Sequence, residues 1–244
     1  MSKSRSGPQR PVVHPFDAKY GVETSGLIPG RRLAVGHPHD RHSTAYYGVA
    51  PSLFRELCRQ WQQTKPPFPI EQYSFVDLGA GKGRALMLAS ELLFREVVGV
   101  ELNPRMAGRA RRNLKVWEET RRARSPVHIE TRDAAEFPFP ANPCLVYLFN
   151  PFAAPVIRRI LKRIEQSFAP GLVDLLYVNH EFQSVLDGRQ GFTRLWSGTI
   201  EMDAEDAQAE KDIVHSEGEG EYTTSGNEEC SVYRWVGKGG KRKS

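Results

Sequence analysis

The stretch Phe75-Val-Asp-Leu-Gly-Ala-Gly-Lys-Gly-Arg84 and the apolar run Val97-Val-Gly-Val100, which ends in Glu101, decide the fold. Together they have the pattern of a strand, a glycine-rich loop, a helix and a second strand that ends in a carboxylate. A unit of this kind holds a nucleoside-containing ligand at the carboxyl edge of a parallel sheet. The glycines permit close approaches that a Cβ atom would block, and Glu101 is placed to accept hydrogen bonds from both ribose hydroxyls.

The spacing of the glycines disfavours a nicotinamide or flavin dinucleotide. Dinucleotide-binding loops have the pattern Gly-x-Gly-x-x-Gly, whose third glycine lets the helix pack closely on the strand. Here Gly79, Gly81 and Gly83 recur at every second position, and Arg84 or Leu86 stands where the third glycine is required. Asp77, two residues before the first glycine, suits a ligand with a cationic amino-acid end.

Two motifs carry a resemblance to a known family. Asp77-Leu-Gly-Ala-Gly-Lys-Gly83, followed by Gly99-Val-Glu-Leu-Asn-Pro104, resembles the first two motifs of class I S-adenosylmethionine-dependent methyltransferases. In that family the glycine loop passes under the methionine part, the acid after the second strand holds the ribose, and an acid after the third strand lies near the adenine amino group. The resemblance implies S-adenosyl-L-methionine as cofactor, with contacts from Asp77, Gly79, Ala80, Gly81, Gly83, Glu101, Leu102, Asp133, Ala134 and Asn150. The alternative, in which the glycines only form a tight strand-to-helix turn, stays open.

The group Asn150-Pro-Phe152 follows the fourth expected strand, at the edge where ligands bind. In amino-methylating relatives, an Asp or Asn before two prolines and an aromatic residue accepts hydrogen bonds from the target amine. This chain has only one proline there, so a base or amide substrate does not carry over. Asn150 and Phe152 are the candidate catalytic residues; alternatively Asn150 caps the next helix and Phe152 packs in the core.

The segment Tyr46-Tyr-Gly-Val-Ala-Pro-Ser52 is similar to the region before the first strand in protein lysine methyltransferases of the seven-strand class. Tyr46 or Tyr47 and Ser52 would close over the methionine end of the cofactor, unless the tyrosines only pack against the sheet. The expected acceptor is therefore a nitrogen of a protein lysine or another amine, in a protein or a small molecule. The alternative function is a catalytically inactive cofactor-binding module that acts on nucleic acid or an acidic partner.

Other polar residues are weaker candidates. His14, His37, His39 and His42 lie near Asp40 in the sequence, but exposed loop histidines are more ordinary than a metal site, and we expect no metal. His180 and Glu181 follow the fifth expected strand, where His180 would be a base or would only help to cap the next helix.

Composition favours one enzyme domain in the cytoplasm. The chain has 244 residues and a formal net charge of +5. We interpret its arginine-rich runs at 105–124 and 158–163 as solvated helix faces. Nucleic acid is therefore a possible but not a favoured partner. Three cysteines without a Cys-x-x-Cys pair argue against disulfides and structural zinc. The sequence has no hydrophobic signal core and no apolar run long enough to span a bilayer.

The expected fold is α/β: a three-layer, Rossmann-like, doubly wound sheet of seven mostly parallel strands, the last antiparallel. Helices are expected at 51–62, 86–94, 104–119 and 154–168, an extended segment at 17–26, and a long hairpin or partly disordered excursion at 201–229. We divide the chain into a disordered tail (1–14), an N-terminal extension and helix covering the site (15–70), the methyltransferase domain (71–237) and a basic C-terminal tail (238–244).

Overall fold

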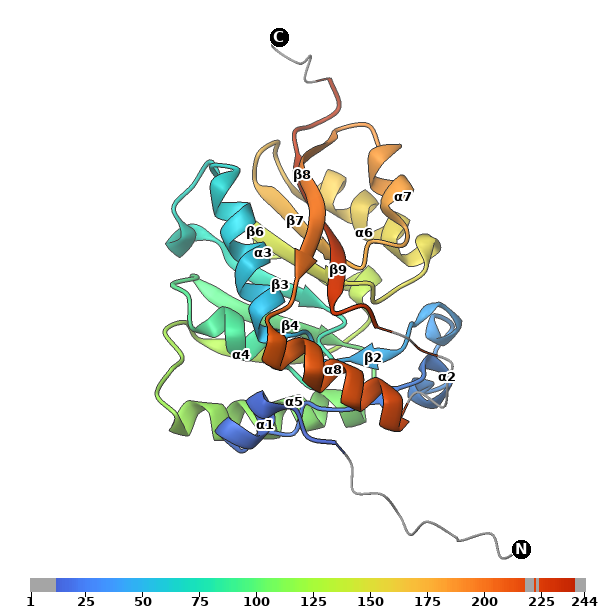
Figure 1. Cartoon of the computed structure of the whole chain (residues 1–244). Coiled ribbons are helices and arrows are strands. Elements are labelled where there is room, and N and C mark those ends of the chain that lie inside the picture. Colours follow the sequence, from blue (N-terminus) through green and yellow to red (C-terminus); the bar gives the residue numbers. More distant parts are fainter. Residues whose placement is uncertain (1–11, 218–221, 223, 240–244) are drawn as a thin grey trace, which may run out of the picture.

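The computed structural model describes residues 12–217, 222 and 224–239. A seven-stranded sheet in the order β5-β4-β3-β6-β7-β9-β8 forms its centre (Figure 1). β3 to β7 run parallel, and β9, the last strand, is antiparallel to both of its neighbours. The strands are β3 (Ser74–Leu78), β4 (Glu96–Glu101), β5 (Val127–Thr131), β6 (Cys144–Phe149), β7 (Val173–Val178), β8 (Phe192–Glu201) and β9 (Asn227–Trp235). This order confirms the predicted fold class.

Helices cover both faces of the sheet because each has one apolar stripe. α3 (Pro51–Gln63), α4 (Arg84–Ser90) and α5 (Pro104–Glu119) pack on one face. The other face is covered by α6 (Ala154–Ser167), η3 (Ala134–Glu136) and α7 (Gln183–Asp187). Leu53, Leu57 and Trp61 of α3 are almost fully buried, as their four-residue spacing predicts.

The strand order reverses between β3 and β6, and this reversal positions the ligand site. β3 pairs with β4 on one side and with β6 on the other, so the connections after β3 and β6 leave in opposite directions. Ligands of open α/β sheets bind beside the carboxyl ends of the strands at such a point. Asp77 of β3 lies there, in register with Gly99 of β4 and Tyr147 of β6.

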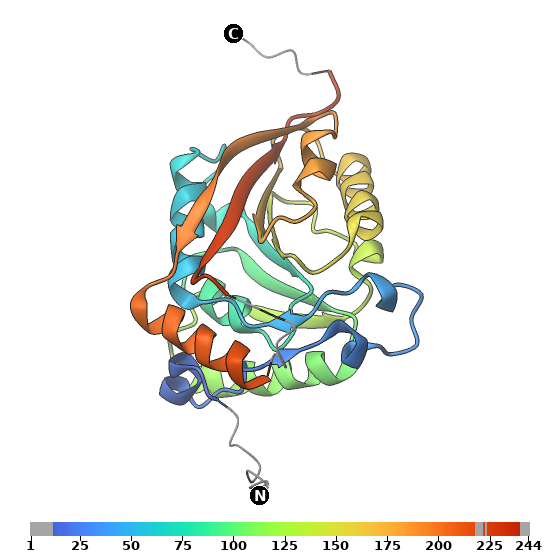
Figure 2. The ribbon, with the colours of Figure 1, turned by 45° about the vertical axis from the view of Figure 1, so that its right-hand side comes forward.

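The N-terminal segment and α8 (Ala204–Glu217) lie across this edge of the sheet (Figure 2). The segment contains α1 (Pro15–Tyr20), β1 (Leu27–Ile28), α2 (Gly30–Leu33), η1 (Asp40–His42) and β2 (Tyr46–Tyr47), with η2 (Ile70–Gln72) preceding β3. β1 and β2 form a short antiparallel ladder, and α8 contacts both β1 and α1. The division of the chain at residues 70 and 71 stays a sequence-based prediction.

Two elements correct the expectations from the sequence. Residues 17–26 were expected to be extended, but the first four of them belong to α1. At its start, His14 Nδ1 accepts a hydrogen bond from the Phe16 amide, and Pro15 stands at the first helical position. At its end, Gly21 adopts a left-handed conformation that terminates the helix. Residues 201–229 were expected to be a hairpin or disordered, but α8 occupies half of that segment. Asp203 caps α8, and Ile213 and Val214 bury its apolar side.

Smaller differences concern the ends of elements. α4 covers residues 84–90, whereas residues 86–94 were expected. The tail expected at 1–14 lies outside the described residues up to position 11, and His14 is buried. Residues 240–244 of the expected C-terminal tail also lie outside them. No helix in the described part of the chain is long and apolar enough to cross a membrane; the cytoplasmic location stays a prediction.

Candidate functional site

A cavity opens at the carboxyl ends of β3 and β4, between the glycine loop and the N-terminal segment. Phe152 and eight of the ten predicted cofactor contacts line it. The eight are Asp77, Gly79, Ala80, Gly81, Glu101, Leu102, Asp133 and Ala134. Gly83 and Asn150 are not among the lining residues, and the roles of the individual residues stay predictions.

The glycine loop has a shape that side chains would prevent. Gly79, Gly81 and Gly83 have φ angles of 90°, 55° and 88°, in the left-handed region that favours glycine. A Cβ atom on Gly81 would clash with the ring of Tyr46, and one on Gly79 would lie 2.7 Å from Pro151 Cβ. The loop therefore needs glycines so that Tyr46 and Pro151 can pack directly on its backbone beside the cavity.

Glu101 links this loop to the start of α5. One carboxylate oxygen accepts a hydrogen bond from the Gly81 amide and the other from the Asn103 amide, both at 2.8 Å. Burial raises the pKa of Glu101, and these backbone hydrogen bonds partly offset that rise. A backbone hydrogen bond from Leu102 uses another of the four lone-pair sites of the carboxylate, so one remains for a ribose hydroxyl.

Asp77 lies at the inner end of the cavity and is only 3% exposed. Burial, and then the nearby charge of Glu101, raise the pKa of Asp77 to about 8. The carboxyl group is therefore mostly protonated at neutral pH. A ligand ammonium group beside it would favour the charged form.

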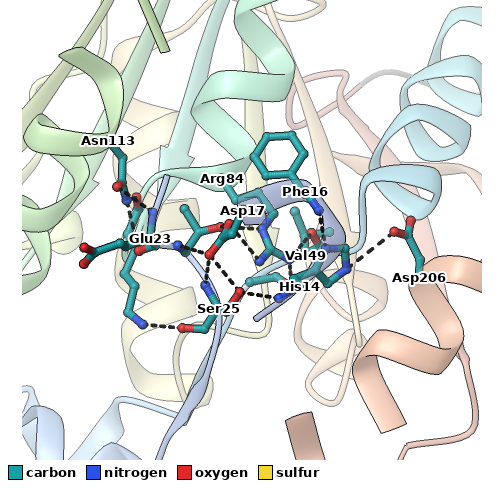
Figure 3. A network of polar contacts seen from close by, with 12 residues as sticks. His14, Phe16, Asp17, Glu23, Ser25, Val49, Arg84, Asn113 and Asp206 are labelled. Atoms are coloured by element: carbon teal, nitrogen blue, oxygen red, sulfur yellow. Dashed lines mark hydrogen bonds and ion pairs between the residues drawn. The ribbon is translucent and has the colours of Figure 1, made fainter. Parts of the chain in front are cut away.

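A buried polar network joins the N-terminal segment to the glycine loop (Figure 3). Arg84, the first residue of α4, donates to Thr24 Oγ1 at 2.6 Å and lies 3.5 Å from Asp17 Oδ1. Asp17 also accepts hydrogen bonds from the amides of Thr24 and Ser25 at 2.5 and 2.6 Å. Both charged side chains are almost fully buried, so the charge of Arg84 is neutralised where it lines the cavity. Sequence analysis missed this pair, which is 67 residues apart and has no local motif.

Tyr46 completes the same contact between segment and loop. Its ring packs on Gly81, its hydroxyl donates to the carbonyl of Thr24 at 2.6 Å, and Lys82 Nζ lies 4.9 Å from the ring centre. Ser52, the other residue matched by resemblance, faces α8 instead. Its amide donates to Asp206, and it does not line the cavity.

Pro151 and Phe152, the two residues after Asn150, line the cavity. Asn150 has a left-handed φ of 36°, and its side-chain amide donates to Glu181 at 3.2 Å. Its Oδ1 atom is buried without a hydrogen-bond partner. Phe152 forms a β-bridge with Ser43 of the N-terminal segment. The catalytic roles of Asn150 and Phe152 stay predictions.

The histidines separate into different sites. His37 and His39 come near Asp133, and one ligand atom from each of these three residues lies within 4.8 Å of the others. His14 instead caps α1 and lies 3.4 Å from Asp206. His180 faces Ser231 Oγ at 3.1 Å and does not line the cavity.

Comparison with known proteins agrees with this geometry. Residues 75–171 match the family model described as a methyltransferase domain. A putative RNA methyltransferase from Pyrococcus horikoshii has a similar structure, with a TM-score of 0.50, 17% identity, and coverage of 75% of this chain and 83% of that one. TrmN from Thermus thermophilus also has a TM-score of 0.50, with 16% identity and coverage of 77% and 49%. At this identity these structures show the shared fold alone. No curated protein matches the chain.

The matched segment begins at β3 and ends after α6, so it contains the glycine loop, Glu101 and Asp133. Its glycine loop, the carboxylate of Glu101 and the buried Asp77 suit a nucleoside carrying a cationic amino-acid end. The chain therefore contains a methyltransferase domain, matched over residues 75–171, whose site suits S-adenosylmethionine as the methyl donor.

Proposed function

We propose that the protein transfers the methyl group of S-adenosylmethionine to the nitrogen of an amine, with a protein lysine side chain as the favoured acceptor. The observation that carries this proposal is a pair of tyrosines that line the cavity. Tyr47 and Tyr147 both line it, and the hydroxyl of each is buried without a hydrogen-bond partner. Buried hydroxyls without partners are costly, so each favours a polar ligand group beside it.

The surroundings of these tyrosines are acidic. Tyr147 stands beside Asp77 in the sheet, and the carboxyl groups of Asp77 and Glu228 both raise the pKa of its hydroxyl, after the larger effect of burial. Glu210 of α8 likewise raises the pKa of Tyr47. Carboxyl groups and tyrosines are the surroundings that suit an incoming ammonium group.

An amine must lose a proton before it can attack the sulfonium methyl group. Burial, and then Glu210, raise the pKa of Glu228 to about 7. A carboxyl group with that pKa can accept a proton near neutral pH, as general bases do. In this proposal the tyrosines orient the amine, Phe152 helps to exclude water, and Glu228, which is not among the residues that line the cavity, takes up the proton that the amine releases.

The proposed donor site uses the predicted contacts. Asp77 would bind the ammonium group of the methionine part, the backbone of Gly79 to Gly81 would pass beneath it, and Glu101 would hold the ribose. Asp133 and Ala134 would lie at the adenine, next to Leu102. Asn150, whose Oδ1 lacks a partner, stays a proposed contact at the methyl-transfer end.

The test is transfer of a labelled methyl group from S-adenosylmethionine to cell lysate, separated afterwards into protein, RNA and small molecules. The proposal expects label in protein, recovered as methyllysine after hydrolysis. Label in RNA alone would refute the lysine acceptor. Label in no fraction, with S-adenosylhomocysteine still bound, would support the inactive module.

Single hydroxyl deletions sharpen the test. Tyr147→Phe and Tyr47→Phe should lower the rate of methyl transfer at least about tenfold, because each removes a polar contact to the acceptor. Tyr47→Phe should keep the affinity for S-adenosylhomocysteine. Tyr73→Phe is the matched control, since the Tyr73 hydroxyl is also buried without a partner but does not line the cavity. Equal rates in all three variants would remove the tyrosines from the acceptor site.

A further inference from the structure

Two buried polar atoms face each other at the proposed adenine end of the cavity. His39 Nδ1 lies 2.8 Å from Asp133 Oδ2, and both residues line the cavity. Although the atoms are close, they are not aligned as a hydrogen bond, and each lacks a hydrogen-bond partner. The side chain of Asp133 is 8% exposed and that of His39 is 15% exposed. The other oxygen of Asp133 accepts from the Ala135 amide at 2.9 Å.

Arg159 of α6 determines which ring nitrogen of His39 carries the proton. Its Nη1 atom lies 3.0 Å from His39 Nε2. A guanidinium group has only donors, so Nε2 must accept. The ring hydrogen then lies on Nδ1, the atom that faces Asp133. The cavity therefore presents an N–H donor beside a carboxylate acceptor.

This tautomer argues against a metal ion among His37, His39 and Asp133, although their ligand atoms are near one another. A metal bound at His39 Nδ1 needs the lone pair of that atom, which would move the ring hydrogen to Nε2. Two donors, from His39 and Arg159, would then face each other. The arrangement fits a neutral hydrogen-bonding ligand better than a cation.

The edge of adenine has the complementary pattern. Its amino group is a donor, and the ring nitrogen beside the amino group is an acceptor. We propose that His39 donates a hydrogen bond through Nδ1 to a ring nitrogen of the adenine while Asp133 accepts one from the amino group. His39 thus makes the N-terminal segment part of the purine-recognition site. This inference rests on the adenine position in the proposed function and is independent of the methyl acceptor.

The test is calorimetric binding of S-adenosylhomocysteine and of S-inosylhomocysteine, in which hypoxanthine replaces adenine and reverses the donor and acceptor pattern. The natural protein should prefer the adenine compound by at least about a hundredfold, because two hydrogen bonds are lost in the other. His39→Ala should weaken binding of the adenine compound about tenfold and reduce this preference. His39→Asn, whose amide nitrogen can replace Nδ1, should restore most of the affinity.

His42→Ala is the matched control, because the His42 ring lies on the same loop 6.2 Å from that of His39 and does not line the cavity. Unchanged affinity and preference in His39→Ala would overturn the inference. The Asp133→Asn variant distinguishes a failure of the role of His39 from a failure of the proposed adenine position. If Asp133→Asn weakens binding and His39→Ala does not, only the role of His39 fails; if neither weakens binding, the adenine position itself is wrong.

Discussion

Replacement of Asp77 by asparagine should remove a pH dependence from cofactor binding. Asp77 is 3% exposed, and burial together with the charge of Glu101 raises its pKa to about 8. The methionine part of the cofactor carries an ammonium group, which binds the carboxylate form better than the carboxylic acid. Binding at neutral pH should therefore be accompanied by release of a proton from Asp77.

The size of the effect follows from that pKa. With a pKa of about 8, the ionised fraction rises from about 1% at pH 6 to about 50% at pH 8. If only the carboxylate binds, affinity for S-adenosylhomocysteine should rise about fiftyfold over that range. Each pH unit below the pKa costs about 1.4 kcal/mol. Asp77→Asn should bind about equally at both pH values, and more weakly than the natural protein at pH 8.

The assay is isothermal titration calorimetry at pH 6, 7 and 8, repeated in buffers with different ionisation enthalpies so that released protons are counted. Glu136→Gln is the control, because Glu136 is an exposed acid that does not line the cavity. The control should keep the pH dependence of the natural protein. Equal pH dependence in Asp77→Asn and the natural protein, or no proton release at pH 7, would refute the reasoning.

The same substitution should affect the stability of the ligand-free protein in the opposite direction. Because the pKa of Asp77 in the folded state lies above its unfolded value of 3.8, the unfolded chain loses this proton first as pH rises. Stability should therefore fall between about pH 4 and pH 8 through Asp77 and change no further above that range. Thermal unfolding at pH 8 should show a higher midpoint for Asp77→Asn than for the natural protein. A lower midpoint would contradict the buried, protonated state.

Three further predictions concern the loop and the cavity. Gly81→Ala should weaken S-adenosylhomocysteine binding at least tenfold, because the added Cβ atom clashes with Tyr46. Gly171, whose φ is also positive, has no neighbour within 4 Å of such an atom, so Gly171→Ala should affect only stability. An equal loss of binding in the two variants would contradict the role of the clash. Arg84→Met should lower the free energy of unfolding in urea by about 3–5 kcal/mol by leaving Asp17 buried and unpaired, and the added Asp17→Asn should recover part of the loss. S-adenosylmethionine, with its extra positive charge, should bind more tightly than S-adenosylhomocysteine in competition assays, and added salt should reduce the difference.

The main elements of the fold could be predicted because their residues repeat an apolar pattern along the chain. Leu53, Leu57 and Trp61 mark one face of α3, and the continuous apolar run of β6 is typical of a strand buried on both faces. α1 has only six residues, too few to show a helical period. α8 buries Asp206 and Glu210 as well as apolar side chains, so its pattern is masked by its acids.

The site was predictable where its residues are consecutive. The loop from Asp77 to Gly83 and the acid at Glu101 belong to a single strand-loop-helix-strand unit, whose function depends on local spacing. The other contributions come from distant segments. His39 meets Asp133 only because the N-terminal segment crosses the end of the sheet, and Glu228 of the last strand acts on Tyr147 only through its charge. Neither the periodicity nor the spacing of residues in the sequence indicates these contacts.

The N-terminal segment also changes the charge of the cavity. Its folding therefore affects whether the cavity favours the methyl donor or the demethylated product. Carboxyl groups of Asp40, Asp77, Glu101 and Asp133 line the cavity, whereas Arg84 is the one arginine or lysine among the lining residues that the structure describes. Asp17 neutralises Arg84 and is itself held by Thr24 and Ser25. An acidic cavity favours the sulfonium donor, which has a net positive charge, over the neutral thioether product. Since Asp17 belongs to α1, the contacts that fold the N-terminal segment also favour donor uptake and product release.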